Sequence, residues 1–466
     1  MDIIKILEAE SRLIDGMFKR NNIYAKVDPE KSIYKDAAAG FIRYGLRLRA
    51  DQHFDKVERL QRELSAALGR QREQMRIAGQ LNVIPVSAPS FALEVPHPAP
   101  ATLLWSGRTL SQAPAHTLII GRSYGEIAKD ETINFGDANG CHVLVAGITG
   151  SGKSILMQHM LLSLCAGTSP EELKIVLVDL KNEDLLPFRA LPHVLTFAGT
   201  REEAVNAIGY VAAEKEKRVA QAGYKPFRLV LVIDEMAQLA SLRGVADTLG
   251  DLASIGRSKG INLIGATQHP TEKGGLGSLL KANFPVRLVG MVAPGQSYAA
   301  TGRAKTFADL LPGKGAFLRC QGPQVQRFQS YFIETEDVEL MTRKIANHWK
   351  ASGYATGYGD GAGVVTAGYG AVIQPVITGY QAGYERLHTS TIIAQPVTGY
   401  GLEKFPLKAA RALSESEAQT VRRLAESGNF DYNGKLSLNR VVMHVYGSKD
   451  PARLVWVKDA IEGANV

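Results

Sequence analysis

The sequence is poor in cysteine and has no long apolar run, and both absences narrow the class of protein. Its 466 residues contain three cysteines, far apart and without a C-x-x-C pair, which argues against a disulfide framework and a cysteine-bound metal. No apolar stretch approaches the roughly 20 residues that span a bilayer, and Met1 precedes a charged amphipathic segment rather than a signal-peptide core. We therefore expect a cytoplasmic protein with no membrane segment in this chain.

A large excess of one charge sign is also missing. The 54 lysines and arginines exceed the 46 acidic residues by only eight, so the net charge of +8 indicates a polyanionic partner only weakly. Apolar content of 45% and charged content of 21% are those of a globular protein. At this length we expect about two to four domains.

One stretch carries a strong chemical signal. Val143–Ala146 has the apolar run of a buried strand, and a helical pattern begins near Lys153. The residues between them fit the phosphate-loop (Walker A) pattern G-x-x-x-x-G-K-[ST], and these are Gly147, Ile148, Thr149, Gly150, Ser151, Gly152, Lys153 and Ser154. In such a loop the backbone N–H groups cradle phosphates, the lysine reaches the β and γ phosphates, and the serine hydroxyl coordinates Mg²⁺. A plain glycine-rich turn would not need this strand and helix, so the pattern predicts a nucleoside triphosphate site.

A second constellation follows the phosphate loop. From residue 117 strands and helices alternate, which favours a parallel sheet with ligands at the carboxyl ends of its strands. The apolar run 228–233 ends in Asp234 and Glu235 (Walker B), which suit Mg²⁺ binding and water activation respectively, although a helix-capping carboxylate is the alternative. Thr267 and Gln268 end the next strand, where they would sense the γ-phosphate or orient the attacking water.

The segments before the phosphate loop predict a small α/β module, residues 1–112. We expect helices over about 3–20 and 54–72, with a strand at 41–49 between them. Arg43, Arg47 and Arg49 alternate along that strand and would either line a path for nucleic acid or form a solvated face. The P-loop domain then occupies 113–350.

The C-terminal part changes character twice. Residues 351–402 repeat Gly-Tyr at low charge, which predicts a flexible linker, and 403–466 predict three short helices. Such helices suit a winged-helix or helix-turn-helix unit, with a partner-binding three-helix bundle as the alternative. The candidate DNA-contacting cations on or beside these helices are Arg440, Lys449, Arg453 and Lys458.

Several motifs in this order resemble those of one family. HVLVAGITGSGKS (142–154), LVIDEMAQLA (231–240), GRSKGINLIGATQHP (256–270) and FADLLPGKGAFL (307–318) are similar to successive motifs of the FtsK and SpoIIIE double-stranded DNA translocases, within the HerA-FtsK class of hexameric motor ATPases. The resemblance covers about residues 1–332. It implies an α/β fold with a RecA-like motor domain, and a ring of six subunits around duplex DNA with ATP held between neighbours.

The resemblance also implies further site residues. Arg257 stands where the family has a cation that reaches the adjacent subunit's nucleotide, and Arg287 is a second basic position in the pattern. With Lys153, Glu235 and Gln268, these arginines complete the expected catalytic set. A family lysine past the strand of Arg287 is missing, since the chain reads Ala293-Pro294-Gly295-Gln296 there.

We therefore expect a DNA-dependent ATPase that pumps or moves along double-stranded DNA of a chromosome, plasmid or mobile element, using ATP and Mg²⁺. The alternative is a secretion or conjugation ATPase whose cargo is protein or single-stranded DNA. A third hypothesis is a nucleotide-dependent DNA-binding switch with slow hydrolysis.

Overall fold

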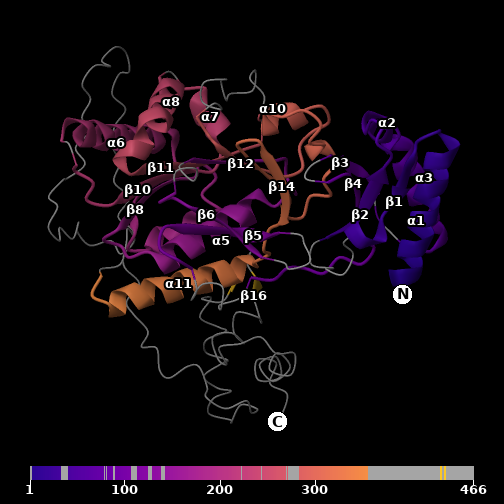
Figure 1. Cartoon of the computed structure of the whole chain (residues 1–466). Helices are drawn as coiled ribbons and strands as arrows, with labels where there is room; N and C mark the ends of the chain where they lie inside the picture. The colour runs from indigo at the N-terminus through magenta and orange to yellow at the C-terminus, as the bar shows by residue number, and fades with distance from the viewer. Residues whose placement is uncertain are drawn as a thin grey trace, which may run out of the picture. The chain divides into compact units, whose positions relative to one another are not determined.

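The computed structural model describes residues 3–32, 40–77, 79, 81–87, 90–105, 113–123, 129–137, 142–221, 223–242, 244–268, 270, 283–354, 431–432 and 435–436. The chain forms two compact units, Met1–Pro375 and Val376–Val466, and nearly all of the description concerns the first (Figure 1). Within the described residues, no helix combines the length and the apolar character needed to cross a bilayer.

The N-terminal module is a four-stranded antiparallel sheet with helices packed on it. Its strands occur in the order β1-β2-β4-β3 and are β1 (Ala25–Val27), β2 (Phe41–Leu48), β3 (Ile84–Val86) and β4 (Ala92–Pro96). Its helices are α1 (Ile3–Arg20), α2 (Asp55–Arg59) and α3 (Gln61–Gln74), with the short 3₁₀ turn η1 (Pro29–Lys31). Apolar side chains of α1 and α3 pack in one core with those of β2 and β4.

The expected helix over about 54–72 was wrong in one respect. The stripe Val57, Leu60, Leu64 and Leu68 is buried as its spacing predicts, but the chain forms two helices that meet at Leu60. Leu60 has φ −81° and ψ −1°, and its N–H bonds to the carbonyl of Val57, three residues back, as in a tightened last turn. The spacing of apolar residues reports the buried face and is blind to such a local break.

The rest of the first unit is organised by a ten-stranded mixed sheet in the order β6-β5-β14-β13-β12-β7-β11-β10-β8-β9. The strands from β12 to β9 run parallel, whereas β13, β14, β5 and β6 extend the sheet in antiparallel fashion. The ten strands are β5 (Thr117–Ser123), β6 (Asp130–Asn134), β7 (His142–Ala146), β8 (Leu173–Val178), β9 (Val194–Ala198), β10 (Arg228–Ile233), β11 (Ile261–Thr267), β12 (Val286–Val289), β13 (Ala316–Gln321) and β14 (Gln324–Gln329). The expected α/β class is confirmed.

Helices cover both faces of this sheet (Figure 1). On one face, α5 (Lys153–Gly167), η3 (Leu186–Ala190) and α11 (Thr335–Ala351) share a core with β7, β8 and β12. On the other, α6 (Arg201–Ala220), α7 (Met236–Ala240) and α8 (Val245–Ile255) share a core with β8, β10 and β11. Alternate side chains of one strand therefore enter different cores, as the pleat requires.

A fourth apolar cluster joins the module to the large sheet. Phe41 and Ile84 of the module pack with Val289 and Leu318, near α10 (Ser297–Thr301) and η6 (Ala308–Leu310). In the second unit the structure describes only a short hairpin, β15 (Asp431–Tyr432) paired with β16 (Lys435–Leu436). The sequence predicted no strands there. The three predicted tail helices and the cations Arg440, Lys449, Arg453 and Lys458 lie outside the described residues.

Candidate nucleotide site

The phosphate loop lies where the sequence places it, between β7 and α5. Gly152 caps α5 with φ +99°, a left-handed conformation that favours glycine. The loop is tied to the sheet edge by hydrogen bonds from the N–H of Gly147 to the carbonyl of Thr267 (3.2 Å) and from the N–H of Ile148 to that of Met291 (2.8 Å). The loop thus rests on the carboxyl ends of the neighbouring strands β11 and β12.

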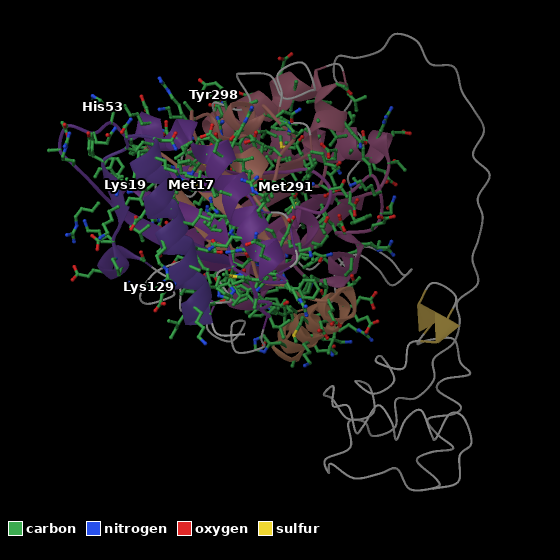
Figure 2. All side chains as sticks on the ribbon, turned by 90° about the vertical axis from the view of Figure 1, so that its right-hand side faces the viewer. Met17, Lys19, His53, Lys129, Met291 and Tyr298 are labelled. Carbon is green, nitrogen blue, oxygen red and sulfur yellow. The ribbon has the colours of Figure 1, made fainter. Side chains whose placement is uncertain are left out.

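A second turn, which the sequence analysis did not predict, is hydrogen-bonded to the phosphate loop. The N–H groups of Lys314 and Gly315 donate to the carbonyls of Gly150 (3.0 Å) and Ser151 (2.9 Å). Gly313, Lys314 and Gly315 all have positive φ, at +72°, +51° and +86°. The segment between Met291 and this turn includes the exposed Tyr298, labelled with Met291 in Figure 2. The sequence does indicate a turn here, because Pro-Gly-Lys-Gly stands within the motif FADLLPGKGAFL (307–318).

The acidic pair and the polar tip of β11 are in contact at the carboxyl edge of the sheet. Because β11 lies between β7 and β10, its end separates the phosphate loop from Asp234 and Glu235. The Thr267 hydroxyl donates to Glu235 Oε1 (3.1 Å), and the backbone N–H of Gln268 donates to both Glu235 oxygens (3.3 and 3.2 Å). Glu235 is buried and held by two donors, which fixes a carboxylate beside the loop.

Charges of both signs are concentrated around Lys153. Burial lowers the pKa of the Lys153 ammonium, while the carboxylates of Glu235 and Asp234 act in the opposite direction. Burial raises the pKa of Asp234, opposed by Lys181, whose Nζ lies 3.2 Å from Asp234 Oδ2. Burial also lowers the pKa of Lys181, but the carboxylates of Asp234, Asp184 and Glu235 together outweigh it and the net pKa is raised. Lysines and carboxylates thus offset one another's charge beside the phosphate loop.

Asp184 is a site residue that the sequence analysis missed. The Ser154 hydroxyl donates to Asp184 Oδ2, and Gln158 Nε2 donates to the Asp184 carbonyl (3.0 Å). The turn that carries Asp184 is organised by Asp179, whose carboxylate accepts the N–H groups of Lys181, Glu183 and Leu185 at 3.0–3.1 Å. The available signal was the acidic content of the loop after β8, at the same edge of the sheet.

The donor set suits magnesium. Mg²⁺ prefers oxygen ligands and is usually held by one or two carboxylates together with phosphates and water. Ser154 Oγ and the Asp234 carboxylate supply such oxygens, and Asp184 orients the hydroxyl. The residues present therefore fit the metal that the sequence predicted.

Arg257 lies at the opposite edge of the sheet from its own phosphate loop. It belongs to the 3₁₀ turn η4 (Gly256–Lys259), which directly precedes β11, and its side chain is exposed. The pKa of His142, the first residue of β7, is lowered to about 4, mainly by burial and in part by the Arg257 cation, which places Arg257 near the start of that strand. A strand of seven residues spans roughly 20 Å, so Arg257 and the loop of the same chain are far apart.

Arg287 lies on the strand next to β7, opposite Leu144. It lies on β12, half-buried, and its Nη1 donates to the carbonyl of Ala300 in α10 (3.5 Å). Burial lowers the pKa of Arg287. The three arginines that the sequence places along the module's strand all form ion pairs. Arg43, Arg47 and Arg49 pair with Glu94, Asp28 and Asp51 respectively. This favours the solvated-face interpretation of that strand.

A phosphate loop between a buried strand and a helix, with an acidic pair two strands away across a polar-tipped strand, defines a P-loop ATPase domain. Residues 111–222 match the FtsK/SpoIIIE family. The resemblance to FtsK/SpoIIIE-type translocases predicted from the sequence is confirmed.

Two relatives illustrate the similarity. DNA translocase FtsK of Mycobacterium leprae is 28% identical over 337 residues, which cover 64% of this chain and 39% of that protein. FtsK of Haemophilus ducreyi is 26% identical over 394 residues, which cover 74% of this chain and 40% of that protein. This chain thus spans about two fifths of the length of these relatives. Among solved structures, the pCW3 conjugation coupling protein TcpA, in a monomer form with ATPγS, matches with TM-score 0.48 and 20% identity over 73% of this chain and 98% of that one.

Proposed function

We propose that this chain is an ATP-driven translocase that assembles as a ring around double-stranded DNA and pumps or moves along it. One observation carries the assembly. Arg257 is exposed at the amino edge of the sheet, whereas the phosphate loop lies at the carboxyl edge. An arginine in that place meets a nucleotide only in a neighbouring subunit. The name shared by the relatives supports DNA as the cargo.

Within one subunit the proposed roles follow from the contacts. The phosphate loop from Gly147 to Ser154 binds the triphosphate, with Lys153 on the β and γ phosphates. Ser154 and Asp234 hold Mg²⁺, which when bound neutralises charge on the phosphate oxygens. Glu235, held by Thr267 and Gln268, accepts the proton of the attacking water.

Between subunits, Arg257 stabilises charge on the transferring phosphoryl group of the neighbour, with Arg287 as a second basic position. We propose that the ring contains six subunits. The buried free thiols Cys165 and Cys320 support the cytoplasm as the compartment.

The test is ATP hydrolysis by the full chain with duplex DNA, single-stranded DNA or no DNA across a salt series. We expect duplex to stimulate hydrolysis at least tenfold, and the stimulation to weaken as salt rises because phosphate contacts release counterions. Glu235→Gln keeps ATP binding and stops displacement of a DNA triplex, whereas Lys153→Ala loses both. Glu202→Gln, an exposed glutamate of α6, is the matched control and behaves as wild type. Absence of duplex stimulation at every salt concentration, or stimulation only by single strands or protein, overturns the proposal.

We also propose the divisions 1–112, 113–350, 351–402 and 403–466, with the last segment a winged-helix-like domain that reads DNA through Arg440, Lys449, Arg453 and Lys458. Deleting 403–466 is expected to keep ATPase activity on generic duplex and to abolish preferential loading at particular sequences, measured by competition between duplexes. Loading preference that survives the deletion would assign the reading to another part of the chain.

A further inference from the structure

We propose that Arg218, a buried arginine of α6, is a positioning residue that holds the Arg257 turn in the orientation needed to reach a neighbouring subunit's nucleotide. The inference rests on the proposed function, since it assigns Arg218 to a site shared between subunits. It concerns a side chain that touches neither the phosphate loop nor the acidic pair in the contacts of its own chain described above.

The contacts of Arg218 converge on the turn between α8 and β11. Its Nη1 donates to the carbonyl of Lys259 (2.9 Å) and approaches that of Gly260 (3.4 Å), and it also donates to the carbonyl of Phe227 (3.0 Å). Its Nε donates to Glu214 Oε1, one helical turn earlier, at 2.7 Å. One guanidinium thus connects α6, the start of β10 and the end of η4.

The turn itself is tightly closed, so anchoring its end fixes the whole. The Gly260 N–H donates back to the Arg257 carbonyl (3.1 Å), and the Gly260 carbonyl accepts the N–H of Leu229 in β10 (2.9 Å). Gly260 has φ +71°, and η4 spans only Gly256–Lys259. Arg257 is therefore two residues from a carbonyl that Arg218 holds, and its direction depends on that hold.

Stability of the fold does not account for this arrangement. Arg218 is 1% exposed, and its Nη2 has no hydrogen-bond partner among the described residues. Burying a guanidinium with an unsatisfied donor is costly, and a buried ion pair is often replaced by apolar residues without loss of stability. The unusual feature is that the Arg218 guanidinium contacts two successive carbonyls, those of Lys259 and Gly260, at the end of the turn that carries the exposed Arg257.

The position of Arg218 also predicts on which nucleotide it acts. Its partners Phe227 and Gly260 precede β10 and β11, so the contacts lie at the amino edge of the sheet, opposite the phosphate loop. A defect at Arg218 should therefore leave nucleotide binding in its own subunit intact and impair hydrolysis next door.

The first experiment separates turnover from binding in the full chain with duplex DNA. We expect Arg218→Met to lower kcat at least tenfold while KM for ATP and binding of a fluorescent ATP analogue change less than threefold. Arg218→Lys, whose ammonium can still donate to a carbonyl, should recover part of kcat. Lys217→Met, the exposed neighbour on the same helix, is the control and keeps wild-type kcat. A parallel loss of ATP binding, or no loss of kcat, overturns the inference.

The second experiment mixes subunits. Lys153→Ala subunits have a dead phosphate loop and an intact Arg257 turn, whereas Arg218→Met subunits have the reverse. Mixtures should hydrolyse ATP several-fold faster than the sum of the two pure variants, with a maximum at an intermediate ratio. If Arg218→Met does not fold, Arg218→Lys is mixed in the same way.

A parallel mixture of Arg257→Ala with Lys153→Ala subunits separates the hypothesis of a site shared between subunits from the positioning role of Arg218. Failure of that mixture to recover activity contradicts the shared site, and with it the proposed function. Recovery there without recovery in the Arg218 mixture contradicts only the positioning role of Arg218.

Discussion

At the scale of residues, the Ser154 hydroxyl donates to Asp184 and can at the same time accept a metal ion. A serine hydroxyl has one proton and two lone pairs. In the structure the proton is donated to Asp184, which leaves the lone pairs for a cation. Asp184 is itself held through its backbone by Gln158, so the direction of the Ser154 hydroxyl is set before any nucleotide binds.

Asp184→Asn should therefore weaken magnesium binding without removing a metal ligand. An amide either donates to Ser154 Oγ or accepts from it without charge, so the hydroxyl loses its fixed orientation. We expect the Mg²⁺ concentration for half-maximal ATP hydrolysis to rise about tenfold, the scale seen when partners of metal ligands are removed. Glu183→Gln changes an exposed neighbour in the same turn and should have no effect. An unaltered Mg²⁺ dependence in Asp184→Asn would assign Asp184 a purely structural role.

At the scale of elements, the Gly313–Gly315 turn determines how well the phosphate loop is supported. A Cβ on Gly315, at φ +86°, would lie 2.8 Å from Gln329 Nε2, which itself donates to the Lys314 carbonyl (2.9 Å). Gly315→Ala would therefore strain the turn and displace its hydrogen bonds to Gly150 and Ser151. We expect KM for ATP to rise about tenfold, as about 1–2 kcal/mol of strain reaches the binding site.

Gly322→Ala provides the matched control for backbone strain. Gly322 has φ +51° in the turn between β13 and β14, and a Cβ there meets nothing within 4 Å. This variant should lose stability in thermal unfolding and keep the wild-type KM. Equal effects of the two alanines on KM would show that the loop does not depend on the second turn.

Three buried histidines predict how the large sheet responds to acid. Burial lowers the pKa of His159 to about 3 and those of His142 and His193 to about 4. Unfolded histidine titrates near 6.5, so below that pH the unfolded chain binds protons that the folded chain does not. The free energy of unfolding should then fall as pH drops from about 6.5 towards about 4, and show no contribution from these groups above 6.5.

His159→Gln tests this at the junction of α5 with β5 and β14. The ring bonds to the Ile119 carbonyl (2.8 Å) and to Ser330 Oγ (2.9 Å). Its loss should reduce the slope of unfolding free energy against pH by about 1.4 kcal/mol per pH unit between pH 4 and 6, measured by urea denaturation. Ser163→Ala, which removes the neighbouring bond to the Ile119 N–H, should shift the curve downward without changing its slope. Identical slopes for His159→Gln and wild type would contradict the assignment.

Sequence predicted the elements whose signals are local. The strand, loop and helix around Lys153, the acidic pair after β10 and the helix Ile3–Arg20 all follow from spacing within a few residues. It could not predict that β11 lies between β7 and β10, or that Ser154 meets Asp184 thirty residues away, because pairing between distant segments leaves no periodic trace. Arg218 escaped for the same reason, since a helix pattern does not report which carbonyls a buried guanidinium meets.

At the scale of the molecule, the N-terminal module is attached to the large sheet by a buried ion pair as well as by apolar packing. Arg327 Nε of β14 lies 2.8 Å from Glu94 Oε2 of β4, and the Arg327 guanidinium stacks on the ring of Phe41 at 4.2 Å. Both charged side chains are at most 6% exposed. Removing one partner of such a pair leaves the other charge buried and unbalanced.

Glu94→Gln should consequently lower the stability of the whole first unit. Because Phe41 and Ile84 share a cluster with Val289 and Leu318, we expect the module and the ATPase domain to unfold in one urea transition, shifted by about 3 kcal/mol in the variant. Asp55→Asn is the control that crosses the same boundary, since Asp55 pairs with Lys305 at the exposed surface and its loss should leave the midpoint nearly unchanged. Two separate transitions in the wild-type protein would mean that the module and the ATPase domain unfold independently. Equal midpoints for Glu94→Gln and Asp55→Asn would mean that the buried pair adds no more stability than the exposed one. Arg327 belongs to β14, which pairs with β13, and β13 begins directly after the Gly313–Gly315 turn. Because that turn supports the phosphate loop, loss of Glu94 should also raise KM for ATP.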